Sequence, residues 1–252
     1  MKIRKYSIQT EKPNIDLKIC LVSDLHAKKS DKVIAAIEQI GADIIVCAGD
    51  ILERLDGLAD EKNSNGFEFL SLASEIAPTF YAFGNHERFG SHREKIKRPD
   101  DACEITDQNR EKIDLTGVTV INDTYTNVEN DVIIGGLIPA YDRPPKDPNV
   151  EFLNAFSSLE GFKILVCHQP DYYDQYLADC DIDLILSGHT HGGQWKVFGR
   201  GVYAPNQGLF PKYSSGIYHN RMVVSAGVSN TEKPIPRFFN PCEIVEINIK
   251  SI

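Results

Sequence analysis

Short apolar runs alternate with amphipathic stretches over the first third of the chain. The runs at 18–23, 43–48 and 79–83 are apolar and partly β-branched, a pattern that predicts buried strands. Between them, 31–40 carries apolar residues on one face of a helix, and 67–76 also has the pattern of a helix. Strands that alternate with helices favour a parallel sheet with helices on both of its faces.

The rest of the chain continues the strand pattern with fewer helices. Strands are expected at 118–121, 124–128 and 132–138, the last two joined by Asn130-Asp131, because Asn and Asp tolerate the positive φ angles of a tight hairpin. Four more apolar runs predict further strands, at 162–167, 182–186, 222–226 and 243–249.

The segments between these runs differ in character. Residues 88–112 are charged and predict helix or irregular structure with a break at Pro99-Asp100, and residues 139–150 hold four prolines and predict a loop. Residues 188–216 are rich in glycine and aromatic residues and lack periodicity. The chain has no repeat, low-complexity tract or linker, so we expect a single domain over residues 1–252.

Composition and charge narrow the possible functions. Hydrophobic residues make up 42% of the chain and charged residues 25%, as in soluble globular proteins. The formal net charge of −9 disfavours nucleic acid as an obligate partner, because non-specific duplex binding needs a basic face. No run approaches the roughly 18 apolar residues of a membrane span, and the basic start of the chain lacks the apolar run of a signal peptide. We therefore expect a cytoplasmic protein without a transmembrane anchor, and the sequence leaves its oligomeric state open.

The six cysteines, at positions 20, 47, 103, 167, 180 and 242, show no CxxC spacing. Cys20, Cys47 and Cys167 lie in apolar runs, where a free thiol behaves as a small apolar side chain. We expect reduced, structural cysteines.

Five polar motifs follow predicted strands directly. In chain order they are Asp24-Leu25-His26, Gly49-Asp50, Gly84-Asn85-His86-Glu87, His168, and Gly188-His189-Thr190-His191-Gly192. In open α/β sheets ligands bind outside the carboxyl ends of the strands. Side chains from most of the chain can therefore point into one crevice.

The residue types in these motifs suit metal ions. Asp, Asn and His donors favour Mn, Fe, Co or Zn over Ca or a structural zinc. Five of the seven histidines lie in the motifs, leaving His92 and His219. Taken singly, Asp-x-His after a strand is more typical of a cap with a hydrogen-bonded histidine, and Gly-Asp is a common turn. The most specific motif is Gly-His-Thr-His-Gly-Gly, because its glycines let the backbone and a ligand approach closely. Together the five favour a metal centre.

With these motifs the sequence resembles the calcineurin-like metallophosphoesterase superfamily, whose pattern is D-x-H, G-D, G-N-H-[D/E], H and G-H-x-H. The resemblance covers roughly residues 17–195 and is closest to small bacterial members that carry G-H-T-H-G-G-Q, as here at 188–194. It implies a four-layer α/β/β/α sandwich, with a second sheet behind the parallel strands.

The resemblance also implies a role for each motif residue. Asp24, His26 and His191 would hold a first metal ion, Asn85, His168 and His189 a second, and Asp50 would bridge them. His86 would be the catalytic residue that faces the leaving group. Glu87 stands where many members have Asp, and it would orient His86.

The chemistry of phosphate esters explains why such a set is useful. Two transition-metal ions (divalent or trivalent Mn, Fe or Zn, with Mn favoured) about 3.5–4 Å apart would clamp the phosphoryl group and hold a bridging hydroxide. The formal charges of two divalent ions, two Asp carboxylates and a hydroxide sum to +1, so the site would still attract an anion. Metal binding lowers the pKa of water towards about 7, which leaves leaving-group protonation to a side chain such as His86.

The sequence leaves several substrate classes open. Protein Ser/Thr phosphatases of the superfamily continue G-D with a Val, Asp, Arg and Gly run and follow D-x-H with Gly, whereas this chain has Ile51-Leu52-Glu53-Arg54 and Ala27. The expected activity is therefore metal-dependent hydrolysis of a small anionic phosphate ester, with phosphodiester or pyrophosphate bonds favoured and a nucleotide or lipid-linked phosphate among the candidates. A phosphomonoesterase, or a catalytically weak metal-binding scaffold for protein interaction, is the alternative.

Two segments, 139–150 and 194–216, are expected to set specificity. Between Gly193 and Asn240 the chain has six basic residues and one acid, interleaved with aromatic residues. One interpretation is a loop packed by its own aromatic side chains. The other is a basic, aromatic wall that contacts a nucleotide or an amphiphilic phosphate, and a lipid-phosphate hydrolase at a membrane surface would use the same residues.

Overall fold

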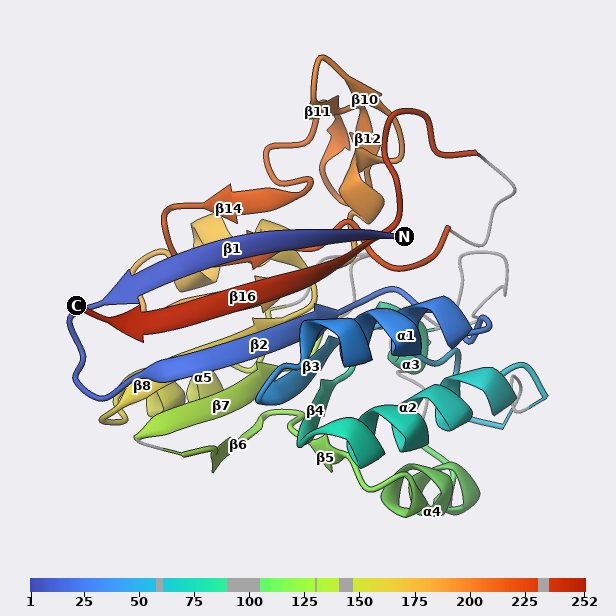
Figure 1. Cartoon of the computed structure of the whole chain (residues 1–252), viewed down its shortest axis with the longest axis horizontal. Helices are drawn as coiled ribbons and strands as arrows, with labels where there is room; N and C mark the ends of the chain where they lie inside the picture. The colour runs from blue at the N-terminus through green and yellow to red at the C-terminus, as the bar shows by residue number, and fades with distance from the viewer. Residues whose placement is uncertain (58–60, 90–104, 130, 141–146, 231–235) are drawn as a thin grey trace.

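The protein is described here from a computed structural model, over residues 1–57, 61–89, 105–129, 131–140, 147–230 and 236–252. Two six-stranded sheets form its centre (Figure 1). Sheet 1 has the order β1 (Lys2–Thr10), β16 (Glu243–Ser251), β2 (Asp16–Val22), β3 (Ile44–Ala48), β4 (Thr79–Ala82) and β5 (Thr119–Val120). Sheet 2 has the order β14 (Gly216–Tyr218), β15 (Met222–Val224), β9 (Leu184–Ser187), β8 (Phe162–Cys167), β7 (Val132–Leu137) and β6 (Thr124–Asn127).

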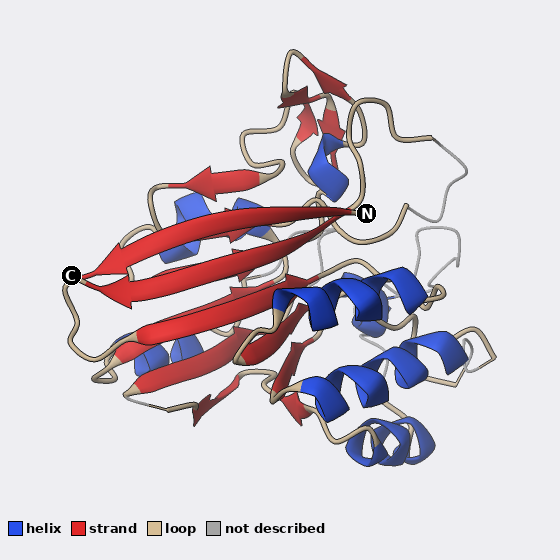
Figure 2. Cartoon of the chain, in the orientation of Figure 1, coloured by secondary structure: helices blue, strands red, loops and turns tan. Residues whose placement is uncertain are grey.

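Each sheet packs one face on the other sheet and the opposite face on helices. The inner faces meet in an aliphatic core that includes Ile19, Val46, Ile164 and Leu186. The outer face of sheet 1 packs on α1 (Asp31–Ile40), α2 (Ser64–Ile76) and α4 (Asp107–Leu115). The outer face of sheet 2 packs on α5 (Val150–Ser157) and on two short turns, the 3₁₀ turn η1 (Pro170–Tyr172) and the π turn η2 (Tyr173–Leu177). The fold is therefore a four-layer α/β/β/α sandwich (Figure 2).

Most of the predicted strands and both predicted helices are present. The expectation from the apolar pattern, one sheet with helices on both faces, is wrong, because the strands divide between two sheets that cover each other. The four-layer sandwich implied by the family resemblance is confirmed. The predicted strand at 118–121 ends in sheet 1 as β5, whereas 124–128 forms β6 of sheet 2, so the chain crosses between the sheets at Asn122 and Asp123. The expected hairpin is confirmed, since β6 pairs antiparallel with β7 and Asp131 has a φ of 60°.

The first strand of the structure is absent from the sequence prediction. β1 alternates exposed and half-buried residues and pairs in parallel with β16, which lies between β1 and β2. Its partner is 241 residues away in register, Lys2 against Glu243, so nothing local marks it.

Two small hairpins extend beyond the sandwich after sheet 2. β10 (Lys196–Val197) pairs with β11 (Arg200–Gly201), and β12 (Tyr203–Ala204) pairs with β13 (Gly208–Leu209). Figure 1 shows them standing clear of both sheets. Of the helices in the described residues, none combines the length and apolar character needed to cross a membrane. The predicted break at Pro99-Asp100 and most of the 139–150 loop lie outside the described residues.

Candidate metal centre

The carboxyl ends of strands from both sheets meet at one edge of the sandwich. There, among the described residues, three groups of side chains place one donor atom each within 4.8 Å of one another: Asp24, His26 and His191; Asp50, His168 and His189; and His26, Glu53 and His86. The first two groups each combine residues after sheet 1 with residues after sheet 2. The sandwich thus brings together motifs that lie far apart in the sequence.

Sharp turns after the strands aim these side chains at the crevice. Five of the seven predicted ligands have positive φ angles, between 48° and 70°: Asp24, His26, Asp50, His189 and His191. This backbone region costs about 1–3 kcal/mol for a non-glycine residue and concentrates at functional sites, although Asp and His tolerate it better than most. Neighbouring glycines make room, since a Cβ at Gly84 would collide with the carboxylate of Asp50 and one at Gly188 would lie 2.8 Å from Asp24 Oδ2.

The carboxylate of Asp50 lies between the first two of these groups. Its Oδ2 is 3.2 Å from His168 Nε2 and 4.0 Å from His26 Nε2, which belong to different groups. In the first group, His191 Nε2 is 3.3 Å from His26 Nε2 and 3.6 Å from Asp24 Oδ1. One carboxylate could therefore contact ions in both groups.

Unpartnered lone pairs show that these residues suit a cation. Asp24 Oδ2, Asn85 Oδ1 and His168 Nε2 are buried and have no hydrogen-bond partner. His168 Nδ1 lies 2.6 Å from the carbonyl of Ala48, so Nδ1 donates there and Nε2 faces the carboxylate of Asp50 at 3.2 Å. A positive charge is needed between Nε2 and this carboxylate, because two facing acceptors repel each other and buried acceptors without a donor cost free energy. A proton on Nε2 meets this need in the metal-free protein, and a metal ion would take its place.

The buried side chains of the centre shift one another's pKa values. Burial alone lowers the pKa of His168, yet the carboxylates of Asp50 and Asp24 outweigh burial and raise that pKa to about 9. Burial raises the pKa of Asp50, but His168, His86 and His26 outweigh it and hold that pKa well below its usual range. His191 differs, because burial and the nearby His26 and Arg237 lower its pKa well below the usual value. His191 is therefore neutral, the state that a metal ligand requires.

Glu87 does not orient His86, contrary to the sequence-based expectation. Its carboxylate accepts hydrogen bonds from the backbone N–H groups of Asp50, Ile51, Leu52 and Gly84 at 2.7–3.0 Å and from the hydroxyl of Tyr81 at 2.5 Å. Four of the five donors lie on the two loops that follow β3 and β4, and Tyr81 lies in β4 itself. Glu87 thus fixes the loops that present Asp50 and Asn85.

Glu53 is the partner of His86, and the sequence analysis gave it no role. Its Oε2 is 2.9 Å from His86 Nδ1, and its Oε1 is 3.2 Å from His26 Nδ1. Burial would raise the pKa of Glu53, but the two imidazoles lower it to about 2. An ionised carboxylate accepts from both Nδ1–H groups, so both rings turn Nε2 towards the centre. The available sequence signal was an acid three residues after the Gly-Asp motif.

Arg237 and Asn206 also reach the centre from unexpected segments. Arg237 Nη2 is 3.1 Å from His191 Nδ1, and Nη1 donates to the carbonyl of Ala226 at 2.8 Å. Asn206, in the β12–β13 turn, places Nδ2 3.5 Å from His189 Nε2. Neither belongs to a motif that sequence reasoning singled out, because only the fold brings them to the histidines.

The basic, aromatic segment between Gly193 and Asn240 contains residues in two different environments. Tyr213 is buried in the core of sheet 2, and Lys212 pairs with Asp174 at 2.7 Å. Arg221 donates to four backbone carbonyls between Leu177 and Ile182. These residues support the self-packed interpretation, whereas Lys196, Arg200 and several aromatic residues lie on the projecting hairpins.

His219 lies away from the centre, as the sequence analysis assumed. Its ring stacks on Tyr173 with centroids 4.2 Å apart, and its Nε2 is 3.0 Å from the hydroxyl of Tyr213. His92 is outside the described residues.

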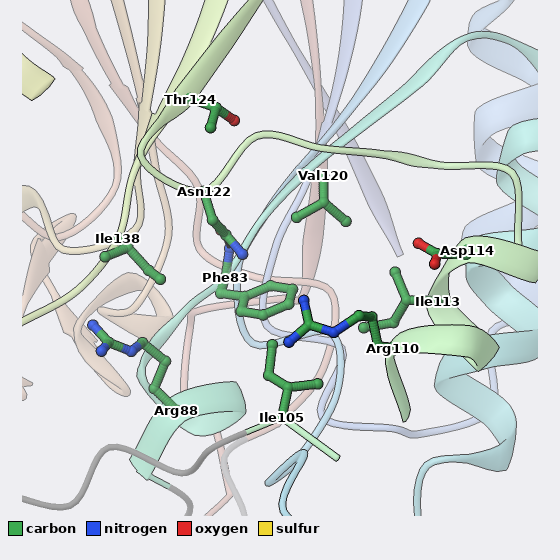
Figure 3. Close-up of a pocket in the computed structure, with 10 residues that line it drawn as sticks. All are labelled: Phe83, Arg88, Ile105, Arg110, Ile113, Asp114, Val120, Asn122, Thr124 and Ile138. Atoms are coloured by element: carbon green, nitrogen blue, oxygen red, sulfur yellow. Dashed lines mark hydrogen bonds between the residues drawn. The ribbon is translucent and has the colours of Figure 1, made fainter. Parts of the chain in front are cut away.

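A separate cavity of about 460 Å³ lies near α3 (Asn85–Phe89). Figure 3 shows its wall, which includes Phe83, Arg88, Arg110 and Asp114. None of the seven predicted ligands lines it. The metal centre and this cavity are therefore different places.

Comparison with known proteins places this geometry in context. A model of the calcineurin-like phosphoesterase family matches residues 17–193, which include all seven predicted ligands and His86. An uncharacterized metallophosphoesterase of Campylobacter jejuni is 29% identical over 257 residues, covering 97% of this chain and 62% of that protein. One of Aquifex aeolicus is 25% identical and covers 99% of this chain and 92% of its own length. Phosphodiesterase YaeI of Escherichia coli is 29% identical over 196 residues, which cover 71% of this chain and 62% of YaeI. The chain spans just under two thirds of the length of the first curated relatives that it matches.

Proposed function

This chain belongs to the calcineurin-like phosphoesterase family, and we propose that it is a metal-dependent hydrolase of phosphate esters with a dinuclear centre. The observation that supports this most strongly is that Asp24 and His168, each with a buried atom that lacks a hydrogen-bond partner, belong to two residue groups that Asp50 connects. Asn85 Oδ1, on the segment after β4, is a further buried oxygen without a hydrogen-bond partner. A scaffold without turnover would be under no demand to keep all seven ligand positions together with His86.

We assign Asp24, His26 and His191 to one ion, and Asn85, His168 and His189 to the other, with Asp50 shared. The donor set of imidazole, carboxylate and amide oxygen suits Mn, Fe or Zn, and Mn²⁺ is the first to test. When bound, such ions neutralise phosphoryl oxygens and acidify water. The chain's own contribution is to fix the donors in place through Glu87, Glu53 and the strained turns.

We assign leaving-group protonation to His86. Glu53 accepts from its Nδ1–H at 2.9 Å, which stabilises the imidazolium and holds the second proton at Nε2. That Nε2 lies 4.0 Å from Asp50 Oδ2, so the proton faces the centre. The carboxylate thus positions the acid.

The substrate class follows from the relatives and from sequence departures. YaeI is named a phosphodiesterase, and the residues after Asp50 and His26 differ from those of protein phosphatases. We therefore infer a phosphodiester or pyrophosphate substrate, with a phosphomonoester as the alternative.

The test compares metal content and hydrolysis in matched variants. Purified protein with Mn²⁺ is assayed against a chromogenic phosphodiester and a chromogenic monoester, and bound metal is measured by elemental analysis. Asp50→Asn and His189→Ala should lose hydrolysis while circular dichroism stays unchanged, and His219→Ala, a histidine away from the centre, should retain it. Full activity in Asp50→Asn or His189→Ala at equal metal loading would refute the dinuclear assignment.

His86→Ala separates acid from ligand. It should keep two ions per chain and lose turnover chiefly on esters with poor leaving groups, because a good leaving group needs no proton. Loss of an ion in this variant would make His86 a ligand instead. An equal loss on all esters would assign it to charge stabilisation in the transition state.

A further inference from the structure

Exposed aromatic and aliphatic side chains lie on the projecting hairpins and on residues 238–239, of which Phe238 pairs with Trp195 at the start of the first hairpin. We call this set the aromatic tip: Val197, Phe198, Leu209, Phe210, Phe238 and Phe239. Phe198 is fully exposed and Phe239 is 90% exposed, so neither contributes to a core. Hydrogen bonds join the pieces, since the Lys196 N–H donates to the Phe238 carbonyl at 3.0 Å and the Phe210 N–H donates to the Val202 carbonyl at 2.8 Å.

The backbone at the tip is unfavourable for the residues that occupy it. Phe198 and Gly199 form a two-residue loop between paired Val197 and Arg200, with φ angles of 49° and 80°. Such a turn prefers Asn, Asp or Gly at its first central position. Phe210 and Phe239 also have positive φ angles, of 53° each. Three phenylalanines therefore occupy strained positions without packing in return, which folding alone does not explain.

The stretch of chain that forms the two hairpins carries basic residues and no acidic ones. Residues 188–231 contain no Asp or Glu, although the chain has 36 acids and a net charge of −9. Arg200 is exposed beside Phe198, and Lys196 at the base of the same hairpin binds the Ser215 hydroxyl at 2.6 Å. The tip therefore offers apolar side chains and flanking cations with no acid in the same stretch.

From this surface we propose that the aromatic tip inserts into the interface of a membrane that contains anionic lipids. Phenylalanine side chains on a projecting turn can enter the boundary between headgroups and acyl chains while basic residues contact anionic headgroups. The hairpin pairs its own backbone groups, so insertion leaves few unsatisfied. An anionic membrane is favoured over a protein partner because three exposed phenylalanines lie at positions of positive φ, and the stretch 188–231 that carries two of them has basic residues but no acid.

The insertion would hold the catalytic centre near the lipid surface. The turn of β12–β13 places Asn206 next to His189, and the paired Tyr203 and Leu209 of the same hairpin are exposed. One hairpin thus connects the tip to the centre. The proposal concerns binding, and its test is independent of hydrolysis.

Vesicle binding tests the proposal directly. The protein is mixed with phosphatidylcholine vesicles, with and without phosphatidylglycerol, and bound protein is separated by flotation. Trp195 is the single tryptophan of the chain and lies at the base of the tip, so its emission should shift to shorter wavelength on binding. Binding should be strongest with phosphatidylglycerol and weaken with added salt.

Matched variants locate the contact. Replacing Phe198, Phe210 and Phe239 by Asn, a residue that tolerates their backbone angles, should keep the fold and reduce vesicle binding at least about tenfold. Arg200→Gln should weaken binding about fivefold on anionic vesicles only. The control is Leu115→Asn with Tyr125→Asn, which removes exposed apolar side chains of α4 and β6 and should bind as wild type.

Two outcomes would overturn the proposal. The first is a wild-type protein that does not bind phosphatidylglycerol vesicles. If that protein instead forms a dimer, and the triple Asn variant is a monomer, the tip binds a second copy of the chain and not a membrane. The second is a triple Asn variant that binds vesicles as tightly as the wild type.

Discussion

Replacing Glu53 by Gln tests how the centre controls two histidines at once. The carboxylate accepts from His86 Nδ1 at 2.9 Å and from His26 Nδ1 at 3.2 Å. Gln has the same shape but only one acceptor oxygen, and its amide N–H group would face one of the two Nδ1–H donors. One histidine must therefore lose its partner or change its tautomer.

The structure shows that both contacts favour the ionised carboxylate. Burial would raise the pKa of Glu53, but the two imidazoles outweigh it and lower that pKa from 4.5 to about 2, a net shift worth about 3 kcal/mol. Removing a residue that orients side chains of a metal site typically costs about 10–100-fold in activity, and we expect Glu53→Gln to fall in that range.

The assay measures kcat/KM on two diesters that differ in leaving group, together with bound metal. The rate should fall about 10–100-fold on the poor leaving group and much less on the good one, with Glu53→Asp recovering part of the loss. The control is Glu246→Gln, which changes a buried acid of β16 that pairs with Lys5 of β1. Wild-type rates on both esters at equal metal content would refute the account of Glu53.

Three further predictions follow from the described contacts. Arg237→Met should lower the unfolding free energy by about 1–3 kcal/mol, because buried carbonyls such as that of Ala226 lose their donor; an unchanged melting temperature by calorimetry would contradict this. Burial raises the pKa of Cys20 to about 12 and also raises the pKa values of Cys47 and Cys167, so these thiols stay protonated at pH 8. They should react with a thiol reagent only after unfolding. Rapid labelling of any of them in the native protein would contradict this prediction. Neutralising Lys196 and Arg200 together should raise KM several-fold for a large anionic substrate, at roughly 1 kcal/mol or less per exposed charge, and should not change KM for a small chromogenic ester. Most of the change should come from Arg200, because Lys196 binds Ser215. An equal loss on both substrates would mean that the hairpin only supports His189 and His191.

The local parts of the fold could be predicted from the sequence. The helix at 31–40 and the strand at 162–167 have the observed bounds, because both bury one strongly apolar pattern. The division into two sheets did not follow from these patterns. β5 and β6 are separated by three residues, and which sheet each joins depends on packing far from either.

The candidate site shows the same limit. The seven ligand positions could be named because Asp, Asn and His repeat at strand ends, a pattern within short motifs. Glu53 and Arg237 could not be assigned, since their partners are 33 and 46 residues away in sequence. Glu87 was given the wrong partner because adjacency in sequence suggested His86, whereas its buried carboxylate faces the backbone of another loop.

The position of β16 has a consequence for how the molecule assembles. The last strand of the chain lies between β1 and β2, so those two strands cannot reach their final spacing until residues 243–251 have been synthesised and inserted. Pairings of such high sequence separation form slowly, because loop closure precedes any gain from contact. The loop that leads into β16 also carries Asn240, whose side chain donates to the carbonyl of His191 at 2.7 Å. The metal-binding geometry should therefore be among the last features of the molecule to form, and uptake of Mn²⁺ during refolding should report completion of sheet 1 rather than its beginning.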